Sequence, residues 1–273
     1  METRMKLAIK VIDAFTDKQF RGNSAAVIVL DRWLPDPLMQ SIAIENNLSE
    51  TAFLLKEENV TEDTLVYHIR WFSPVTEIDF CGHATLASAH VVFGLFPNSH
   101  EIEFVADAVG VMRVEKKADG FIQMNFPSRP PQKPDYIPSA LLDGLSIAPS
   151  AILQNEQAYF AIYDNEDDVM LVEQDTSQIK KLAPYDVVVT APSKHFDFVS
   201  RYFWPANGGD EDPVTGSIHT GLAPYWSQQL GKKELAAYQA SKRGGVLKCV
   251  IAGDRVLVSG QTVQYLSGEI IIR

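Results

Sequence analysis

One short pattern occurs twice in this chain, about half the chain length apart. Arg70–Pro74 reads Arg-Trp-Phe-Ser-Pro, and Arg201–Pro205, 131 residues later (201 − 70), reads Arg-Tyr-Phe-Trp-Pro. Each copy ends a predicted strand and is followed by a short acidic loop, a glycine-containing turn and a predicted helix of small residues. Self-similarity at a fixed spacing is typical of a chain that uses one structural unit more than once. The sequence therefore predicts two similar lobes.

A proline-rich stretch marks the expected boundary between the lobes. Five prolines lie between Pro127 and Pro138, which makes this stretch the best linker candidate in the chain. We expect an N-terminal lobe over residues 1–126 and a C-terminal lobe over residues 127–265. The last strand, about residues 266–273, is expected to join the N-terminal lobe.

Apolar periodicity predicts both strands and helices in each lobe. Helices are expected at about His83–Phe93 and about Ile218–Leu230, among strands with alternating apolar side chains. Val169–Leu171 is predicted to be a short strand, and the C-terminal stretch two strands, Thr262–Leu266 and Glu269–Ile272. The mixture predicts an α+β fold.

The charge balance narrows the possible partners. The chain carries 24 basic and 35 acidic residues, for a net charge of −11, which excludes nucleic acid and anionic membrane surfaces as expected partners. Two cysteines, Cys81 and Cys249, fit a reducing compartment, and no apolar run approaches the ~20 residues of a membrane span. A cytoplasmic protein is expected. The histidines show no metal-ligand spacing, so the sequence predicts no metal site.

The two matched segments, Cys81–Ala89 and Glu211–Gly221, are candidate anion sites. The first N–H groups of a helix lack intrahelical partners and lie at the positive end of its dipole, so they bind carboxylates. Gly82 and Gly216 would let a ligand approach the backbone. The alternative is that each segment is only a capped helix with a tight turn.

Four polar residues near these turns are candidates for chemistry. Glu50 follows a predicted helix and begins an apolar strand, where a partly buried carboxylate suits proton transfer; alternatively it faces water or caps the helix. His83 lies in the first turn of a helix, which is expected to lower its pKa and keep the ring neutral. Asp212 is a candidate N-cap that could also orient a ligand. Cys81 could be a reactive thiolate.

Taken together, four motifs resemble the PhzF-like family of phenazine biosynthesis, a branch of the diaminopimelate epimerase fold. The resemblance runs over nearly the whole chain, and the order of the motifs makes it specific. They are Val11–Thr16 with Gly22–Val27, Leu48–Phe53, Cys81–Leu86, and Glu211–Ser217.

The resemblance implies two similar lobes related by pseudo-two-fold symmetry. Each is expected to be a mixed sheet curled around a central helix, with the active site in the cleft between them. It also implies a homodimer, no metal and no organic cofactor. Glu50 matches the family's acid–base glutamate, and His83 and Asp212 match residues that orient the substrate. Positions that match substrate contacts are Ser49, Gly82, Gly216 and Ser217.

These residues predict a cofactor-independent isomerase that moves a proton between carbons of a small carboxylate-bearing metabolite. Diaminopimelate epimerases use one cysteine from each lobe, whereas here only Cys81 stands at such a position. The missing thiol favours isomerisation by Glu50 over two-thiol racemisation. Two alternatives stay open: an epimerase that pairs Cys81 with Glu50, and a non-catalytic small-molecule-binding protein on the same scaffold.

Overall fold

The computed structural model describes residues 4–58 and 65–273, and the chain forms two compact units. Unit 1 takes the residues up to Asn125 together with Ser259–Arg273, and unit 2 takes Phe126–Val258. Among the described residues, no helix has the length and the hydropathy needed to cross a lipid bilayer.

Unit 1 is a mixed sheet with two helices, and its strand order brings both ends of the chain together. β1 pairs antiparallel with β2, β2 runs parallel to β3, β3 pairs antiparallel with β4, and β4 pairs with β5 (antiparallel) and β6 (parallel). β6 then pairs antiparallel with β7. The elements are β1 (Met5–Ala14), β2 (Asn23–Leu30), α1 (Asp36–Asn46), β3 (Glu50–Lys56), β4 (Leu65–Phe72), β5 (Glu77–Ile78), α2 (Gly82–Leu95), β6 (Glu101–Ala106), β7 (Gly110–Lys116), β8 (Ile122–Pro127), which reaches the unit boundary, and β17 (Thr262–Ile272).

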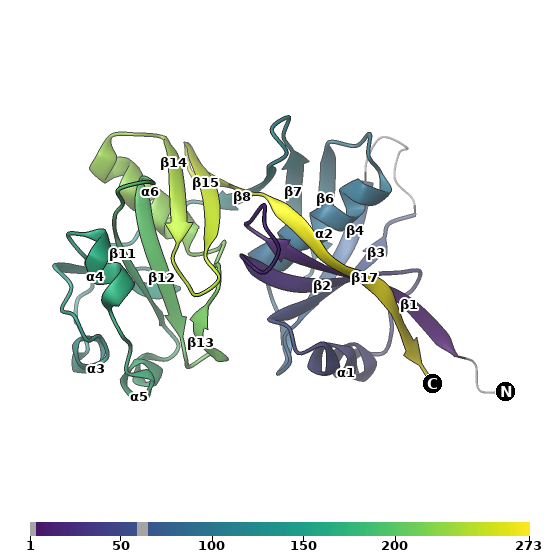
Figure 1. Ribbon diagram of the computed structural model, residues 1–273, viewed down its shortest axis with the longest axis horizontal. Coiled ribbons are helices and arrows are strands. Elements are labelled where there is room, and N and C mark those ends of the chain that lie inside the picture. The colour runs from purple at the N-terminus through teal and green to yellow at the C-terminus, as the bar shows by residue number, and fades with distance from the viewer. Residues whose placement is uncertain (1–3, 59–64) are drawn as a thin grey trace. The chain divides into compact units, whose positions relative to one another are not determined.

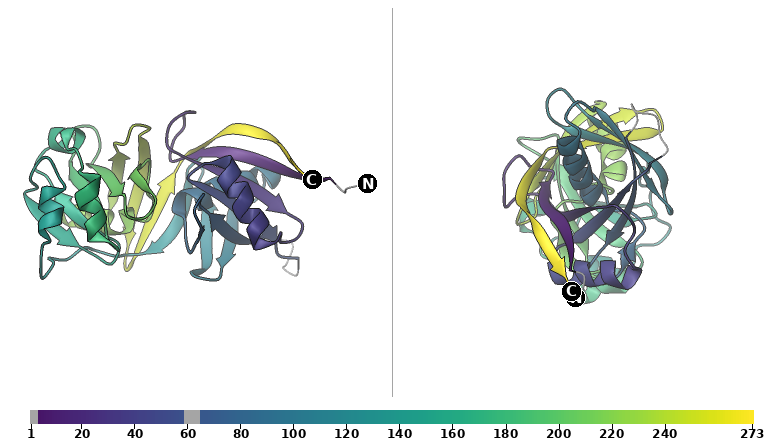
Figure 2. Two further views of the ribbon diagram at one scale, coloured as in Figure 1. Left: turned by 90° about the horizontal axis from the view of Figure 1, so that it is seen from below. Right: turned by 90° about the vertical axis from the view of Figure 1, so that its right-hand side faces the viewer.

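The C-terminal stretch of unit 1 is one continuous strand, β17, so the prediction of two strands was wrong. β17 pairs antiparallel with β1 from Thr262 to Ile272, with one register shift near Val11. Figures 1 and 2 both show it lying alongside β1. Because β1 offers a long partner, the ladder runs through Ser267 and Gly268, where the sequence alone suggests a break.

Helix α2 is the buried helix of unit 1 (Figure 1). It is apolar around its circumference and contacts β1, β2, β3 and β17. A helix of this kind is stable only inside a core. Its alanines allow the strands to approach closely, and its first turn, at Gly82 and His83, is held rigidly by the sheet around it.

Unit 2 repeats the pairing order of unit 1. β9 pairs antiparallel with β10, β10 runs parallel to β11, β11 pairs antiparallel with β12, and β12 pairs with β13 (antiparallel) and β14 (parallel). β14 then pairs antiparallel with β15. The elements are α3 (Ser139–Asp143), β9 (Ala151–Gln154), β10 (Ala158–Ile162), α4 (Glu166–Leu171), α5 (Thr176–Ile179), β11 (Asp186–Pro192), β12 (Phe198–Trp204), β13 (Gly209–Asp212), α6 (His219–Leu230), β14 (Glu234–Gln239), β15 (Gly245–Ala252) and β16 (Arg255–Gly260), which reaches the unit boundary.

Val169–Leu171 belongs to helix α4, and the prediction of a strand there was wrong. The side chain of Asn165 caps the helix by accepting a hydrogen bond from the backbone N–H of Asp168. Acidic residues fill the first turn, where the helix dipole favours negative charge. These local signals outweigh the β-branched character of Val169.

In each unit, the arginine of the repeated pattern forms a bidentate ion pair with a glutamate of the next short strand. Arg70, in β4, donates from Nε and Nη2 to both carboxylate oxygens of Glu77 in β5, at 2.6 Å each. Arg201, in β12, donates in the same way to Glu211 in β13, at 2.8 and 3.0 Å. Each bidentate pair fixes the short strand that leads to the next turn, which carries Cys81 in unit 1 and follows Asp212 in unit 2.

Arg201, in unit 2, is more buried than Arg70 and also bonds to two backbone carbonyl oxygens. Arg201 also donates from Nη1 to the carbonyl oxygens of Val169 and Val172, at 3.2 and 2.7 Å. Its side chain is 16% exposed, whereas Arg70 is 26% exposed and its additional partner, Asp36, is 69% exposed. The two arginine–glutamate pairs should therefore contribute different amounts to the free energy of unfolding.

We expect Arg201→Met to lower the free energy of unfolding by about 2 to 3 kcal/mol, because Glu211 loses its charged partner in a part-buried place. Arg70→Met, the matched variant in unit 1, is expected to cost about 1 kcal/mol or less, since its partners are more exposed. Urea denaturation of both variants measures the difference. Equal losses would contradict the unequal burial of the two pairs.

His219, in the first turn of α6, is fully buried in unit 2. Its Nδ1 lies 2.8 Å from the carbonyl oxygen of Thr215, which can only accept, so Nδ1 carries the hydrogen. Nε2 has no hydrogen-bond partner in the described part of the chain, and the ring lies against Phe198. Burial lowers the pKa of His219 to about 4.

This histidine should make unit 2 less stable in acid. The unfolded chain takes up a proton at His219 near pH 6.5, whereas the folded chain does so only near pH 4, so stability falls as the pH drops through this window. Between pH 7 and pH 4 the loss is about 3 kcal/mol. His219→Asn, which keeps a donor for Thr215, is expected to remove this part of the pH dependence. If the unfolding free energies of the wild type and of His219→Asn change with pH in the same way, the role assigned to His219 is contradicted.

Candidate active site

Glu50 is the first residue of β3, and its side chain is buried. It is 5% exposed and stands in register with Ala25 of the parallel strand β2. The preceding helix α1 ends where Asn47 takes a left-handed conformation (φ 49°), which turns the chain into β3. Glu50 therefore neither faces water nor caps the helix, and the alternative sequence interpretations of this residue are wrong.

Cys81 and His83 are held at the start of α2. Cys81 is the N-cap residue, in extended conformation, and its carbonyl oxygen accepts from the backbone N–H (3.0 Å) and the hydroxyl (2.7 Å) of Thr85. Both Cys81 and His83 are buried, at 7% and 6% exposed. The first turn thereby directs the thiol and the imidazole into the same small space.

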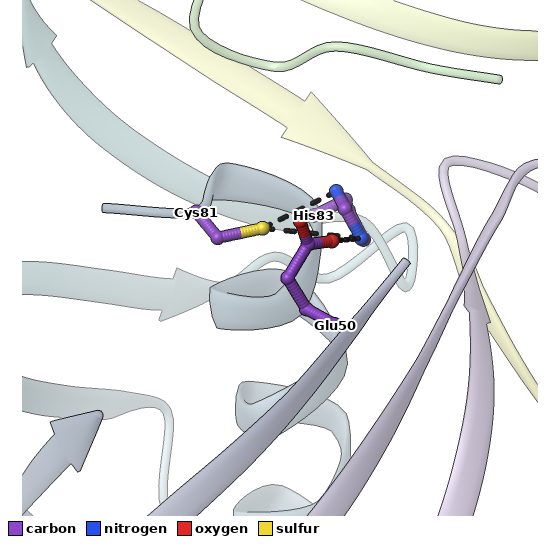
Figure 3. A group of neighbouring side chains, drawn as sticks. All are labelled: Glu50, Cys81 and His83. Atoms are coloured by element: carbon purple, nitrogen blue, oxygen red, sulfur yellow. Dashed lines mark hydrogen bonds and ion pairs between the residues drawn. The ribbon is translucent and has the colours of Figure 1, made fainter. Parts of the chain in front are cut away.

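The ring of His83 contacts both the carboxylate of Glu50 and the thiol of Cys81 (Figure 3). Its Nε2 lies 2.8 Å from Glu50 Oε2, and its Nδ1 lies 3.3 Å from Cys81 Sγ. Within the described residues Oε2 has no partner that meets hydrogen-bond geometry, so the ring N–H approaches this oxygen without pointing at it. This carboxylate oxygen is thus buried without a well-formed hydrogen bond.

Asn23 supports this group and was not among the predicted site residues. Its Nδ2 lies 3.2 Å from His83 Nδ1, and its Oδ1 accepts from the hydroxyl of Ser49 at 3.1 Å. The preceding Gly22 has φ +64°, and a Cβ there would lie 2.0 Å from the carbonyl oxygen of Ala14. The Gly-Asn pair in the first motif is the sequence signal for Asn23: a turn that only glycine can make places a buried amide.

The electrostatics of the group differ from the sequence prediction. Burial alone would lower the pKa of His83, but Cys81 and Glu50 beside the ring outweigh burial, and its pKa lies well above the ordinary value. The predicted lowering of this pKa by the helix dipole was therefore wrong, because Glu50 and Cys81 lie in direct contact with the ring. Burial, together with Glu50, raises the pKa of Cys81 to about 11. Cys81 is therefore a protonated thiol, and the thiolate prediction was also wrong.

In unit 2, Asp212 ends β13, and it is not the N-cap of α6 as predicted. The hydroxyl of Thr215 donates to Asp212 Oδ2. Helix α6 begins at His219, and the cap position, Ile218, makes no side-chain cap hydrogen bond. The turn at Gly216 intervenes, with the N–H of His219 donating to the carbonyl oxygen of Gly216 at 3.2 Å.

Gln239, in β14, fixes this turn and was missed by sequence reasoning. Its Oε1 accepts from the backbone N–H of Thr215 at 2.9 Å, and its Nε2 donates to the carbonyl oxygen of Asp212 at 3.0 Å. Ser217 is held separately, since its Oγ accepts from Nε2 of Gln157 at 3.0 Å. No local signal marks Gln239, because its partners lie more than 20 residues earlier in the chain.

In unit 1 the structure brings Glu50 and His83 into contact and links Ser49 to the ring through Asn23, while Gly82 lies between Cys81 and His83 in the first turn of α2. In unit 2, Asp212 is bonded to Thr215, next to Gly216 in the chain, whereas Ser217 is bonded to Gln157 instead. The ligand atoms of Glu50, Cys81 and His83 lie within 4.8 Å of one another, so these three could hold a metal ion. Whether any of the predicted residues contacts substrate stays a prediction.

Comparisons with a family model and with solved structures both match this chain to phenazine biosynthesis-like proteins. The family model described as "Phenazine biosynthesis-like protein" matches residues 12–268. The chain is 43% identical to an uncharacterized isomerase from Pseudomonas aeruginosa, over 97% of this chain and 99% of that protein. A crystal structure of a PhzF-family phenazine biosynthesis protein from Enterococcus faecalis has a TM-score of 0.90 at 39% identity, covering 97% of this chain and 99% of that one.

More distant structures share the fold alone. A hydroxyproline epimerase from Agrobacterium vitis has a TM-score of 0.61 at 10% identity, covering 98% of this chain and 93% of that one. The α+β fold is thus common to PhzF-family and epimerase proteins. Relatives that are 41–43% identical are named isomerases. The chain belongs to the phenazine biosynthesis-like PhzC-PhzF family and is an enzyme of the isomerase type.

Proposed function

We propose that the protein is a cofactor-independent isomerase in which Glu50 takes a proton from one carbon of a small carboxylate-bearing metabolite and returns it to another. The observation that carries the proposal is the state of Glu50 Oε2, which is buried, close to His83, and without a hydrogen-bond partner among the described residues. A base of this kind is shielded from water, and the proposal requires that a bound substrate bring its carbon-bound proton up to the carboxylate. The shift is balanced, since one proton leaves carbon and one returns.

His83 supports both halves of the proton shift. Its raised pKa favours an imidazolium ring, which stabilises the charged carboxylate of Glu50 before proton removal. When Glu50 has taken the proton, the same positive ring lies close to the negative charge that develops on the substrate. A cation placed at developing charge stabilises a transition state without needing to reorganise.

The proposal includes a substrate held by groups from both units, in a cleft between two lobes of pseudo-two-fold symmetry. The backbone at Gly82 and at Gly216 would bind carboxylate, with Ser49 and Ser217 as further contacts and Asp212 orienting the ligand. The support is the recurrence of one strand–loop–turn–helix order in both halves and the match of both to family motifs. A homodimer remains part of the same proposal.

Glu50→Gln is expected to lower turnover by about 10²–10⁴-fold while binding changes little, because the amide keeps the shape but cannot carry the proton. Incubating the wild type with a metabolite extract in heavy water identifies the substrate as the compound that gains deuterium by mass spectrometry. The variant is then assayed on that compound. Glu45→Gln, an exposed glutamate of α1, is the matched control and should keep full activity.

Two outcomes would contradict the proposal. A Glu50→Gln protein with full activity would exclude Glu50 as the proton carrier. A wild type that retains a compound tightly, without any deuterium entering it, would favour the binding-protein alternative instead.

A Cys81–Glu50 epimerase is the second candidate, because the thiol lies in the same cluster and is protonated. An epimerase needs its acid and base on opposite faces of one carbon. With each about 3–3.5 Å from the reacting atom, the two groups would be about 6–7 Å apart. Cys81 Sγ and the Glu50 carboxylate lie within 4.8 Å of each other, which favours the isomerase.

Cys81→Ser separates these two candidates. The isomerase proposal expects the variant to retain activity within about tenfold of the wild type, because the thiol carries no substrate proton. The epimerase requires a loss of about 10²-fold or more. The check is the rate of deuterium uptake, with the stereochemistry of the product determined by chiral chromatography. An inactive, folded variant would overturn our preference.

A further inference from the structure

We propose that Glu50, Cys81 and His83 also form a binding site for a soft divalent cation such as Zn²⁺, and that a bound cation stops proton transfer. The three side chains offer a sulfur, a nitrogen and an oxygen, the ligand atoms that zinc takes in proteins. All three ligand atoms lie within 4.8 Å of one another. Spacing along the sequence does not reveal the group, because Glu50 precedes Cys81 by more than 30 residues.

The distances come close to those around a tetrahedral ion. Metal–ligand bonds of about 2.0–2.3 Å place neighbouring ligand atoms about 3.3–3.6 Å apart. His83 Nε2, the ring nitrogen beside Glu50, lies 3.9 Å from Cys81 Sγ and 2.8 Å from Glu50 Oε2. To bind one ion with Nε2, the sulfur would have to come closer by about 0.3 Å and the carboxylate oxygen to move away by about half an ångström.

A buried oxygen without a well-formed hydrogen bond gives the site a second, independent basis. Glu50 Oε2 is inaccessible to water, and its ion pair with His83 Nε2, at 2.8 Å, does not meet hydrogen-bond geometry. A buried polar atom in this state is costly unless a ligand completes it. Its oxygen faces the ring of His83 (Figure 3), where a cation bound to that ring would lie.

The charges also balance. Binding forms a sulfur–metal bond, a nitrogen–metal bond and an oxygen–metal bond to the Glu50 carboxylate, and the protons on Cys81 Sγ and on the coordinating nitrogen of His83 leave to solvent. Thiolate and carboxylate together carry two negative charges, which a divalent ion neutralises. In the metal-free cluster the raised pKa of His83 favours a positive ring beside Glu50, and a divalent ion would take the place of that charge. A neutral cluster avoids the penalty of a buried net charge.

The effect on catalysis depends on the proposed function, whereas binding itself does not. Glu50 can act as a base only with a free lone pair, and a coordinated carboxylate has given that lone pair to the metal. The ring of His83 would lose its positive charge as well. Metal occupancy and proton transfer therefore exclude each other at the same atoms.

Cadmium is the probe for binding, because a cadmium–thiolate bond absorbs in the ultraviolet. Titration of the full-length, chelator-washed protein with Cd²⁺ is expected to give one band that saturates at one ion per chain. The chain has two cysteines, so Cys249→Ala is the matched control and should keep the band, while Cys81→Ser should lose it. No band in the wild type, or a band lost only in Cys249→Ala, would overturn the site.

The other two ligands are tested by affinity. Glu50→Gln and His83→Asn are each expected to weaken Cd²⁺ binding by more than about tenfold, the scale seen when support for a metal is removed. Glu45→Gln should bind as the wild type does. Near-ultraviolet circular dichroism confirms that each variant is folded. An unchanged affinity in folded Glu50→Gln would exclude the carboxylate and overturn the three-ligand site.

Inhibition is measured with the heavy-water assay. Zn²⁺ is expected to suppress deuterium uptake over the concentration range in which it displaces Cd²⁺ from Cys81, and a chelator should restore activity. Metal binding without inhibition would overturn the inhibitory role. If the metal-free protein shows no uptake at all, the proposed isomerase function fails, while the cadmium titration still decides the metal site.

Discussion

The chemistry of unit 1 depends on one contact, that of a buried carboxylate with an imidazole ring. Removing a charged pair from water costs several kcal/mol per ion unless close partners compensate. The surroundings of Glu50 and His83 hold the pair in place through a chain of contacts. The amide nitrogen of Asn23 lies beside the ring, Ser49 donates to the amide oxygen of Asn23, and the left-handed turn at Gly22 places the asparagine. The backbone turn at Gly22 thereby helps to position the Glu50 carboxylate, which is proposed to carry the proton.

Unit 2 uses the same strand order for a different polar group. Where unit 1 has an acid beside a cationic ring, unit 2 has Asp212 beside the hydroxyl of Thr215 and the amide of Gln239. An amide and a hydroxyl orient a carboxylate but do not exchange its proton near neutral pH. The nearby histidine, His219, is kept neutral by burial, and its bond to a carbonyl oxygen places the hydrogen on Nδ1. On the proposed function, the two units would separate proton transfer, in unit 1, from ligand positioning, in unit 2.

The sequence predicts those features that depend on short stretches of chain. The repeat and the helices opening at Gly82 and near Ile218 follow from local spacing, and α2 and α6 are present as expected. The continuity of β17 was missed because it depends on pairing with β1, at the other end of the chain. Gln239 was missed for the same reason. The pKa of His83 was wrong because a helix end is visible in sequence, whereas the approach of Glu50 is not.

A positive charge on His83 would also let so acidic a chain take the anionic substrate that we propose. The net charge is −11, so capture must come from local groups. With a neutral ring, a substrate carboxylate about 4 Å from Glu50 would meet a repulsion of about 4 kcal/mol at an effective dielectric constant of about 20. An imidazolium ring in contact with Glu50 cancels most of this. The amides at the start of α2 then act on the substrate without opposition, and the raised pKa of His83 becomes a condition of binding as well as of proton transfer.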